Sequence, residues 1–248
     1  MGVPLLSTGM SVSFDFGDDV VLVTGVGGTL GSAVAEAFLD AGATVCGADL
    51  VTPEDEDFSL DDPDRIDFYG GDFTDEATVE SAVGDIAEAH GGLDVLCNIA
   101  GTWRGGDPID ETPVESFDLL FDVNLKTGFL ASKHAIPHLR ERDEGQGAIV
   151  SVASRSSLEG GSGDGLYRAS KAGVRLLSES IAEENVGEVR ANAVMPSVID
   201  TPMNREMIPN GDFESWVDPE EIAQVICFLA SDGADVTSGA AVPVYGEA

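Results

Sequence analysis

Short apolar segments alternate with segments of helical periodicity along most of the chain, and this alternation limits the possible folds more than any other feature. Strands joined through helices form right-handed βαβ units and lie parallel in one sheet. We therefore predict an α/β fold, a doubly wound parallel sheet of about seven strands with helices on both faces. The expected strands are 19–25, 43–50, 66–72, 93–101, 147–154, 189–196 and 241–245. Five helices are expected. In chain order they are 30–41; one capped by Thr74 that ends near 90; 113–140, with a break near Gly128; one that holds Tyr167 and ends near 184; and 219–231, with Asp218 as cap and Pro219 at its first position.

One domain accounts for the whole length. No repeat, linker or change of composition divides the 248 residues, and such a length suits one large hydrophobic core. We expect the domain to cover 13–248 and residues 1–12 to form a loose tail, in which Met10 offers a second start. The chain lacks both a basic leader and a long apolar run, so we expect a soluble, cytoplasmic protein with no membrane partner.

The charge of the chain is strongly one-sided. There are 46 acidic residues against 12 basic ones, which gives a net charge of −34. Such a protein repels itself in dilute salt, and molar salt screens that repulsion. The acids are scattered over many segments, which is typical of solvated surfaces in the proteins of a halophile and less so of one cation site. Nucleic acid is not an expected partner, because no basic patch is present to neutralise phosphates.

A glycine-rich turn, TGVGGTLG at 24–31, follows the first expected strand and leads into the first helix. Glycines let the backbone approach a pyrophosphate, and the helix start offers unpaired N–H groups to that anion. A glycine turn alone is also consistent with an ordinary connection, but its place between strand and helix favours dinucleotide binding. The predicted cofactor contacts in the turn are Gly25, Gly28, Thr29, Leu30 and Gly31.

Asp49 ends the second expected strand, about twenty residues after the turn, where a carboxylate can bind the ribose hydroxyls of NAD and repel the extra phosphate of NADP. Leu50 follows it, at a position where a basic residue would bind that phosphate. The loop 52–64 is rich in acids, and Arg65 is the nearest cation. Asp49 could also be one more acid of an acidic protein. We predict contacts from Asp49 and Leu50 and favour NAD over NADP as cofactor.

Ser154, Tyr167 and Lys171 form the strongest chemical signal in the chain. Tyr167 and Lys171 are four residues apart, on one face of a helix, and Ser154 stands thirteen residues before the tyrosine. A neighbouring ammonium favours the phenolate and is expected to lower the tyrosine pKa from about 10 toward neutrality. Such a tyrosine exchanges protons with an alcohol or carbonyl oxygen.

The sequence predicts no metal site. The three cysteines, Cys46, Cys97 and Cys227, lie in apolar segments without paired spacing, so we expect buried free thiols. His134 and His138 are four residues apart on a helix, but no third ligand accompanies them. We expect these histidines at a surface or a subunit interface.

These motifs resemble the short-chain dehydrogenase/reductase family, in its compact single-domain form, from Val20 to about Gly246. The resemblance implies a Rossmann-type fold. It also implies that Asn124 completes a catalytic tetrad with Ser154, Tyr167 and Lys171, in which Lys171 holds the cofactor ribose. Further cofactor contacts that it implies are Asp72 and Phe73 at adenine; Asn98, Ala100 and Gly101 in the segment NIAG; Tyr167 and Lys171; and Pro196, Val198 and Thr201 around the nicotinamide and phosphates.

The chain departs from the family pattern in four places. Thr29 replaces the middle glycine of the turn, a form that looks more like the extended, epimerase-type branch, for which this chain is too short. Ser197 replaces the glycine after Pro196, and the segment 201–219, normally a mobile substrate lid, is short. Residues 246–248 lack the usual final glycine pair. A short lid is expected with an open pocket or a small polar substrate.

The expected function is hydride transfer between NAD and a secondary alcohol or ketone, such as a sugar, polyol, 3-oxoacyl thioester or hydroxy acid, with Tyr167 as general acid and base. A non-catalytic NAD sensor or scaffold and, with less support, a sugar-nucleotide epimerase are the alternatives. Arg104 or Arg155 could bind an anionic or sugar substrate, or each could neutralise nearby acids. The resemblance implies a homo-oligomer, a tetramer or dimer, built through the long helix.

Overall fold

A seven-stranded sheet forms the centre of the protein, and all of its strands are parallel, in the order β3-β2-β1-β4-β5-β6-β7. The computed structural model describes residues 13–142 and 145–247; the expected tail at 1–12 lies outside them. The predicted fold class is confirmed, and each expected strand is present. The strands are β1 Val20–Thr24, β2 Thr44–Asp49, β3 Asp67–Gly70, β4 Val95–Asn98, β5 Gly147–Val152, β6 Val189–Pro196 and β7 Ala241–Val244.

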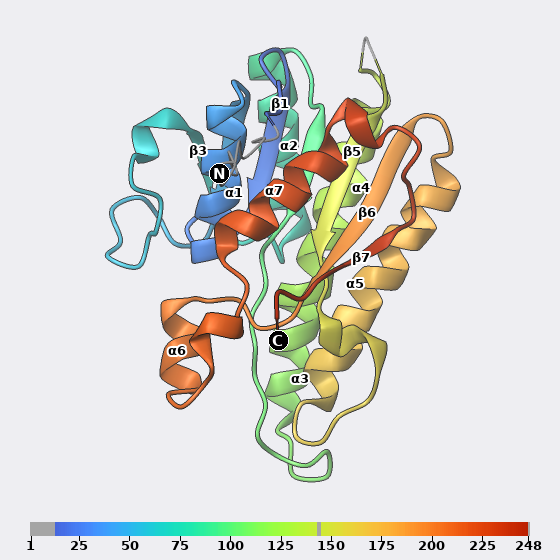
Figure 1. Cartoon of the computed structure of the whole chain (residues 1–248). Helices are drawn as coiled ribbons and strands as arrows, with labels where there is room; N and C mark the ends of the chain where they lie inside the picture. The colour runs from blue at the N-terminus through green and yellow to red at the C-terminus, as the bar shows by residue number, and fades with distance from the viewer. Residues whose placement is uncertain (1–12, 143–144, 248) are drawn as a thin grey trace, which may run out of the picture.

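Helices cover both faces of the sheet (Figure 1). α1 (Thr29–Asp40) and α7 (Pro219–Ala230) pack on one face, and α2 (Glu76–His90), α4 (Thr127–Leu139) and α5 (Gly165–Glu184) pack on the other. Side chains of a strand alternate between faces, so in β1 Val21 and Val23 join the core under α1 and α7, whereas Val20 and Leu22 join the core under α2 and α4. Burial on both faces explains why this strand has an unbroken apolar sequence.

The structure corrects two helix boundaries. Asp75, and not Thr74, caps α2, because its carboxylate accepts a 3.1 Å hydrogen bond from the backbone N–H of Thr78. The hydroxyl of Thr74 donates instead to Asp72, at 2.7 Å. The long helix expected at 113–140 is α3 (Val114–Phe121) followed by α4, and a π-helical turn at Asp122–Lys126 separates them, just before Gly128.

The order in which strands are added changes direction at the middle of the sheet: β2 and β3 follow on one side of β1, and β4 to β7 follow on its other side. Open parallel sheets bind ligands at such a switch point, beyond the carboxyl ends of the strands. α6 (Pro202–Met207) and the start of α3 lie at that end of the molecule (Figure 1). Among the described residues, no helix combines the length and apolar character that crossing a bilayer requires.

Candidate active site

The glycine turn is held close to the end of β4. Gly25 has a φ of +72°, which glycine adopts without strain. A Cβ atom at Gly25 would lie 2.8 Å from the backbone of Ala100, and one at Gly31 would lie 1.9 Å from the carbonyl oxygen of Gly25. Both positions therefore require glycine, because the turn folds back on itself and onto β4.

The N-terminus of α1 is suited to an anion. Gly28 is the N-cap residue, so no side chain satisfies the first N–H groups, and no acidic residue occurs in the first turn despite the acidity of the protein. The side chain of Leu30 is in the core, which leaves only its backbone for a ligand, and Thr29 is half-buried. Free N–H groups and the helix dipole at this end favour a phosphate.

Asp49, at the end of β2, faces this turn. One carboxylate oxygen accepts a 2.8 Å hydrogen bond from the N–H of Gly27, and the other accepts from Val51 at 3.1 Å. The adjacent Leu50 is 70% exposed. Asp49 thus lies beside the glycine turn, and its carboxylate is held by backbone N–H groups on either side.

Asp72 and Phe73 follow β3 and have different environments. Asp72 is exposed and accepts hydrogen bonds from the hydroxyl and the N–H of Thr74, which lower the pKa of its carboxyl group. The ring of Phe73 is buried in the core beneath α2, so its side chain is not available to an adenine.

Asn98 ties three elements together at the end of β4. Its Nδ2 donates to the hydroxyl groups of Ser132 (3.1 Å) and Ser151 (3.2 Å). The side chain is buried, and its Oδ1 has no hydrogen-bond partner among the described residues. The predicted contact residue is therefore also a structural link between β4, α4 and β5.

Thr24 was not among the predicted site residues, although it directly precedes the glycine turn. Its buried hydroxyl oxygen accepts hydrogen bonds from the N–H groups of Ile99 (3.1 Å) and Ala100 (3.3 Å). It joins the end of β1 to the segment after β4. A threonine that ends a strand before a glycine turn was the available signal, but its partners are distant in sequence.

The four predicted catalytic residues converge beyond the ends of β4 and β5. Ser154 follows β5, is buried, and accepts a hydrogen bond from the N–H of Ser156. Tyr167 lies in the first turn of α5, with Ser154 as its hydrogen-bonding neighbour. A Cβ atom at Gly101 would lie 3.0 Å from Lys171 Nζ and 3.2 Å from Asn124 Oδ1, so the missing side chain leaves room for both groups.

Asn124 is in the π-helical turn, and both polar atoms of its side chain are hydrogen-bonded. Its Oδ1 accepts from the N–H of Thr102 at 2.7 Å, and its Nδ2 donates to Ser170 at 3.0 Å. Ser170 in turn donates to the carbonyl oxygen of Tyr167 at 2.8 Å. This chain connects α5 with the loop after β4 and fixes the start of α5.

The protonation of Tyr167 and Lys171 differs from the expectation. Burial raises the pKa of Tyr167 above its ordinary value of 10, and the hydrogen bond from Ser154 only partly opposes this. Burial also lowers the pKa of Lys171 to about 8. Lys171 Nζ donates to the carbonyl oxygen of Val152 at 2.8 Å. The expected lowering of the tyrosine pKa by Lys171 is thus wrong for this structure, because burial has the largest effect on this pKa and the groups that lower it are Ser154 and Arg168.

The remaining predicted cofactor contacts lie at the end of β6 and in the segment that follows it. Pro196 ends β6 and is buried, Val198 is half-buried, and Thr201 caps α6 by accepting from the N–H of Asn204. The segment expected to be a short lid has internal contacts: Arg205 pairs with Asp200, and its guanidinium lies 5.0 Å from the ring centre of Phe213.

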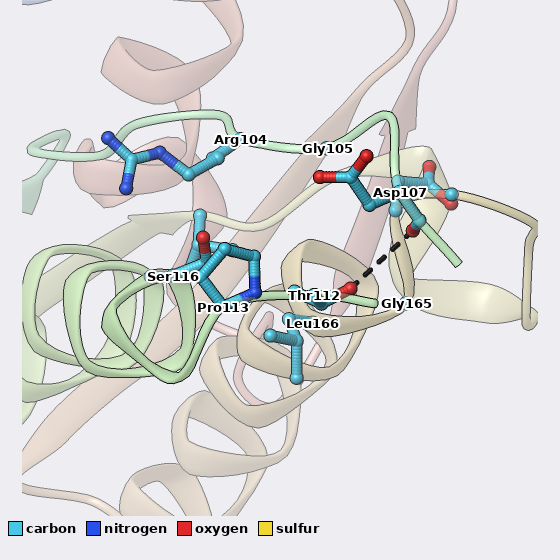
Figure 2. A pocket seen from close by; sticks show the side chains of 11 residues that line it. Arg104, Gly105, Asp107, Thr112, Pro113, Ser116, Gly165 and Leu166 are labelled. Atoms are coloured by element: carbon cyan, nitrogen blue, oxygen red, sulfur yellow. Dashed lines mark hydrogen bonds between the residues drawn. The ribbon is translucent and has the colours of Figure 1, made fainter. Parts of the chain in front are cut away.

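A cavity of about 240 Å³ opens beside, and not over, the four converging residues. Figure 2 shows Arg104 reaching along one side of it, with Ser116 and Pro113 below and Asp107 on the other side. Arg155 is elsewhere, 5.0 Å from the ring of Tyr245. The remaining lining residues are Gly105, Thr112, Leu120, Gly163, Asp164, Gly165 and Leu166.

The cysteines and histidines agree in part with their predicted environments. Cys46, Cys97 and Cys227 are free and buried, as predicted. His134 lies 3.4 Å from Glu76, which Lys133 also contacts, and His138 lines a shallow pocket with Lys133 and His134 between α2 and α4.

Residues 25–246 match a family model described as enoyl-(acyl carrier protein) reductase. The chain is 33% identical to a 3-oxoacyl-[acyl-carrier-protein] reductase of Thermotoga maritima, over 92% of this chain and 96% of that protein. It is 34% identical to meso-2,3-butanediol dehydrogenase of Serratia marcescens, over 94% and 95%. The solved structure of a short-chain glucose/ribitol dehydrogenase from Brucella melitensis superposes with a TM-score of 0.83 at 28% identity, over 95% of this chain and 98% of that one.

Proposed function

This chain belongs to the short-chain dehydrogenase/reductase family, and from that membership we propose that it is an NAD-dependent oxidoreductase in which Tyr167 is the general acid and base. Members of the family use a nicotinamide cofactor to interconvert secondary alcohols and ketones. The finer points are the identity of the cofactor, the proton-transfer residue and the residues around them.

The convergence of Asn124, Ser154, Tyr167 and Lys171 carries the proposal. These residues come from three separate segments of the chain, and they meet at the carboxyl ends of β4 and β5, next to the glycine turn. A purely structural role does not require a lysine to be buried beside a tyrosine, because burial disfavours the charged form of the lysine.

Each residue of the tetrad has its own role in the proposed reaction. When bound, NAD supplies the hydride acceptor or donor. Tyr167 Oη takes the hydroxyl proton of an alcohol in oxidation and returns a proton to the carbonyl oxygen in reduction. Ser154 Oγ orients that oxygen, and Asn124 would position a water molecule that links Lys171 Nζ to solvent, which completes a proton relay. The other three residues of the tetrad thus position Tyr167 and restore its protonation state after each turnover.

The surroundings of Asp49 support NAD over NADP. Its carboxylate is held by two backbone N–H groups, so it is fixed where a 2′-phosphate would have to lie. Arg65 lies 3.3 Å from Asp40 and is engaged there. A 2′-phosphate there would meet a negative charge, while Arg65, the nearest cation along the sequence, is paired with Asp40.

The residues around the turn and the strand ends complete the proposed cofactor site. Gly25, Gly28, Thr29, Leu30 and Gly31 would hold the pyrophosphate through the backbone, and Asp49 with Leu50 the ribose. We also assign to the cofactor the backbone of Phe73 and the backbone or side chains of Asp72, Asn98, Ala100, Gly101, Pro196, Val198 and Thr201.

A sensor or scaffold is less consistent with these observations, because it would not require the proton-transfer residues. A sugar-nucleotide epimerase is also disfavoured, since the relatives that match over almost the full length are named as reductases and dehydrogenases. Exposed apolar side chains on α3, α4 and α5 support the proposal of a homo-oligomer; they are Val114, Phe117, Phe129 and Leu176.

Turnover in molar KCl tests the function. NAD and NADP are offered separately with a panel of secondary alcohols, sugars and 3-oxoacyl esters, and nicotinamide absorbance is followed. Turnover with NAD that falls by about 10²–10⁴-fold in Tyr167→Phe supports the proposal. Tyr69→Phe, in β3, is the matched control and should retain turnover. Cofactor binding is measured in parallel by NADH fluorescence. A Tyr167→Phe variant as active as the native protein would contradict the proposed mechanism.

A further inference from the structure

Cys46, Asp67 and His90 bring three possible metal ligands together at one edge of the sheet. Cys46 in β2 is paired in register with Asp67 in β3, so their side chains project from the same face of two neighbouring strands. His90 is the last residue of α2, which covers that face. The cysteine sulfur, one carboxylate oxygen and one imidazole nitrogen all lie within 4.8 Å of one another.

The imidazole of His90 supplies a second observation. Among the described residues its buried Nε2 atom has no hydrogen-bond partner, although it lies at ion-pair distance, 3.3 Å, from Asp67 Oδ2. Buried polar atoms are normally satisfied, and a cation held by Asp67 and His90 would satisfy this nitrogen. Tetrahedral zinc with bonds of about 2.0–2.1 Å holds nitrogen and oxygen ligands about 3.3 Å apart. The observed separation already fits that geometry.

The sulfur requires a small adjustment. A thiolate bonded to zinc at about 2.3 Å lies about 3.6 Å from the other two ligand atoms, so Cys46 Sγ has to move inward by no more than about 1.2 Å. A cysteine rotamer change or a shift of the exposed Asp67 supplies such a movement. Asp67 is 60% exposed, so water can reach a fourth position on that side.

We propose that Cys46, Asp67 and His90 bind one zinc ion, with water as the fourth ligand. Thiolate, imidazole and carboxylate together suit zinc better than the hard cations calcium and magnesium. The sequence predicted no metal site, because the three ligands are separated by more than twenty residues each and only the strand register and the end of α2 bring them together.

The position of the proposed zinc site indicates a structural role and not a catalytic one. Asp49 is three residues further along β2, about 10 Å at the rise of a strand, and lies at the cofactor end, whereas the three ligands lie toward the opposite end. A bound ion would fasten the edge strand β3 and the end of α2 to β2. This edge carries the acid-rich loop 51–62 that leads away from Asp49.

Cobalt substitution tests the proposal directly. The native protein, freed of metal and kept in molar KCl to screen the many surface acids, is titrated with Co²⁺. We expect one equivalent to give a thiolate-to-cobalt charge-transfer band. This band requires both the ion and a coordinated thiolate, so it reports directly that Cys46 is a ligand. Zinc should displace the cobalt and raise the melting temperature.

Matched variants distinguish this site from casual binding. Cys46→Ala should abolish the band, whereas Cys227→Ala, which removes another buried free thiol, should retain it. Asp67→Asn and His90→Gln should weaken cobalt binding at least tenfold, and Glu88→Gln, an exposed acid on α2, should not. Because Asp67 is exposed, its variant remains informative if Cys46→Ala does not fold. Absence of the band in the native protein, its survival in Cys46→Ala, or unchanged affinity in both other variants would overturn the proposal.

Discussion

Lys171 Nζ donates a 2.8 Å hydrogen bond to the carbonyl oxygen of Val152, the last residue of β5. This contact joins the N-terminal half of α5 to β5, the strand that leads to Ser154. The lysine is buried, and its ammonium has a carbonyl rather than a carboxylate as its partner. A charge in this setting costs stability, which is the basis of the first prediction.

Lys171→Met should stabilise the cofactor-free protein near pH 7. Burial lowers the pKa of Lys171 from its ordinary value of 10.5 to about 8, a difference that corresponds to about 3 kcal/mol. Between these pH values the unfolded chain binds the proton that the folded protein has released, so the native unfolding free energy rises with pH. Denaturant unfolding at pH 7 and pH 9 measures this. The stability advantage of the variant should shrink as pH rises, and a constant difference would contradict the prediction.

Tyr167 should titrate above pH 10 in the cofactor-free protein, because burial raises its pKa and Lys171 does not offset this. The phenolate absorbance of native protein minus that of Tyr167→Phe isolates this residue from Tyr69 and Tyr245. We expect no phenolate difference at pH 8. A difference signal at that pH would show that the lysine acidifies the tyrosine without the cofactor.

Asp49→Asn should reduce the preference for NAD over NADP by at least tenfold, about 1.4 kcal/mol. The amide oxygen can still accept a hydrogen bond from the N–H of Gly27, while the charge that repels a 2′-phosphate is removed. The ratio of the two dissociation constants is the readout. Asp57→Asn, in the acid-rich loop that follows β2, is the control, and an equal change in both variants would point to general charge instead of this position.

Gly31→Ala and Gly28→Ala should differ sharply. A Cβ atom at Gly31 would lie 1.9 Å from the carbonyl oxygen of Gly25, whereas one at Gly28 meets only the same oxygen, at 3.5 Å. We expect Gly31→Ala to lower the unfolding free energy by about 1–3 kcal/mol or more and to weaken cofactor binding. Gly28→Ala should change stability little. Chemical denaturation of both variants tests this, and similar losses would contradict the close approach at Gly31.

Raising KCl from 0.1 M to 2 M should raise the melting temperature. The net charge of −34 repels itself in dilute salt, and molar salt shortens the screening length to a few ångströms. A gain of about 3 kcal/mol corresponds to roughly 10 °C for a chain of this length. Calorimetry at several salt concentrations provides the measurement, and an equal rise in sucrose without salt would show that the cause is not charge.

The sequence by itself determined the order of strands and helices, because burial on both faces demands apolar strands and the helices retain their own periodicity. It also determined that Tyr167 and Lys171 lie four apart on one helix, whereas Asn124 was expected only from the family resemblance. The N-cap at Asp75 and the break at 122–126 were not predictable with the same accuracy, because Thr74 was an equally good cap and the π-helical turn depends on the packing of Asn124.

Only the tertiary structure decided the electrostatics and the distant contacts. The pKa directions of Tyr167 and Lys171 depend on desolvation, which is a property of the packed site and not of residue spacing. The environment of Arg190 was also not predictable from the sequence. This arginine lies in an otherwise apolar strand and is fully buried, and its guanidinium donates to the carbonyl oxygens of Leu229 and Ala230 at the end of α7. Spacing along a chain specifies which residues share an element, whereas burial and partners arise only when elements from distant parts of the chain pack together.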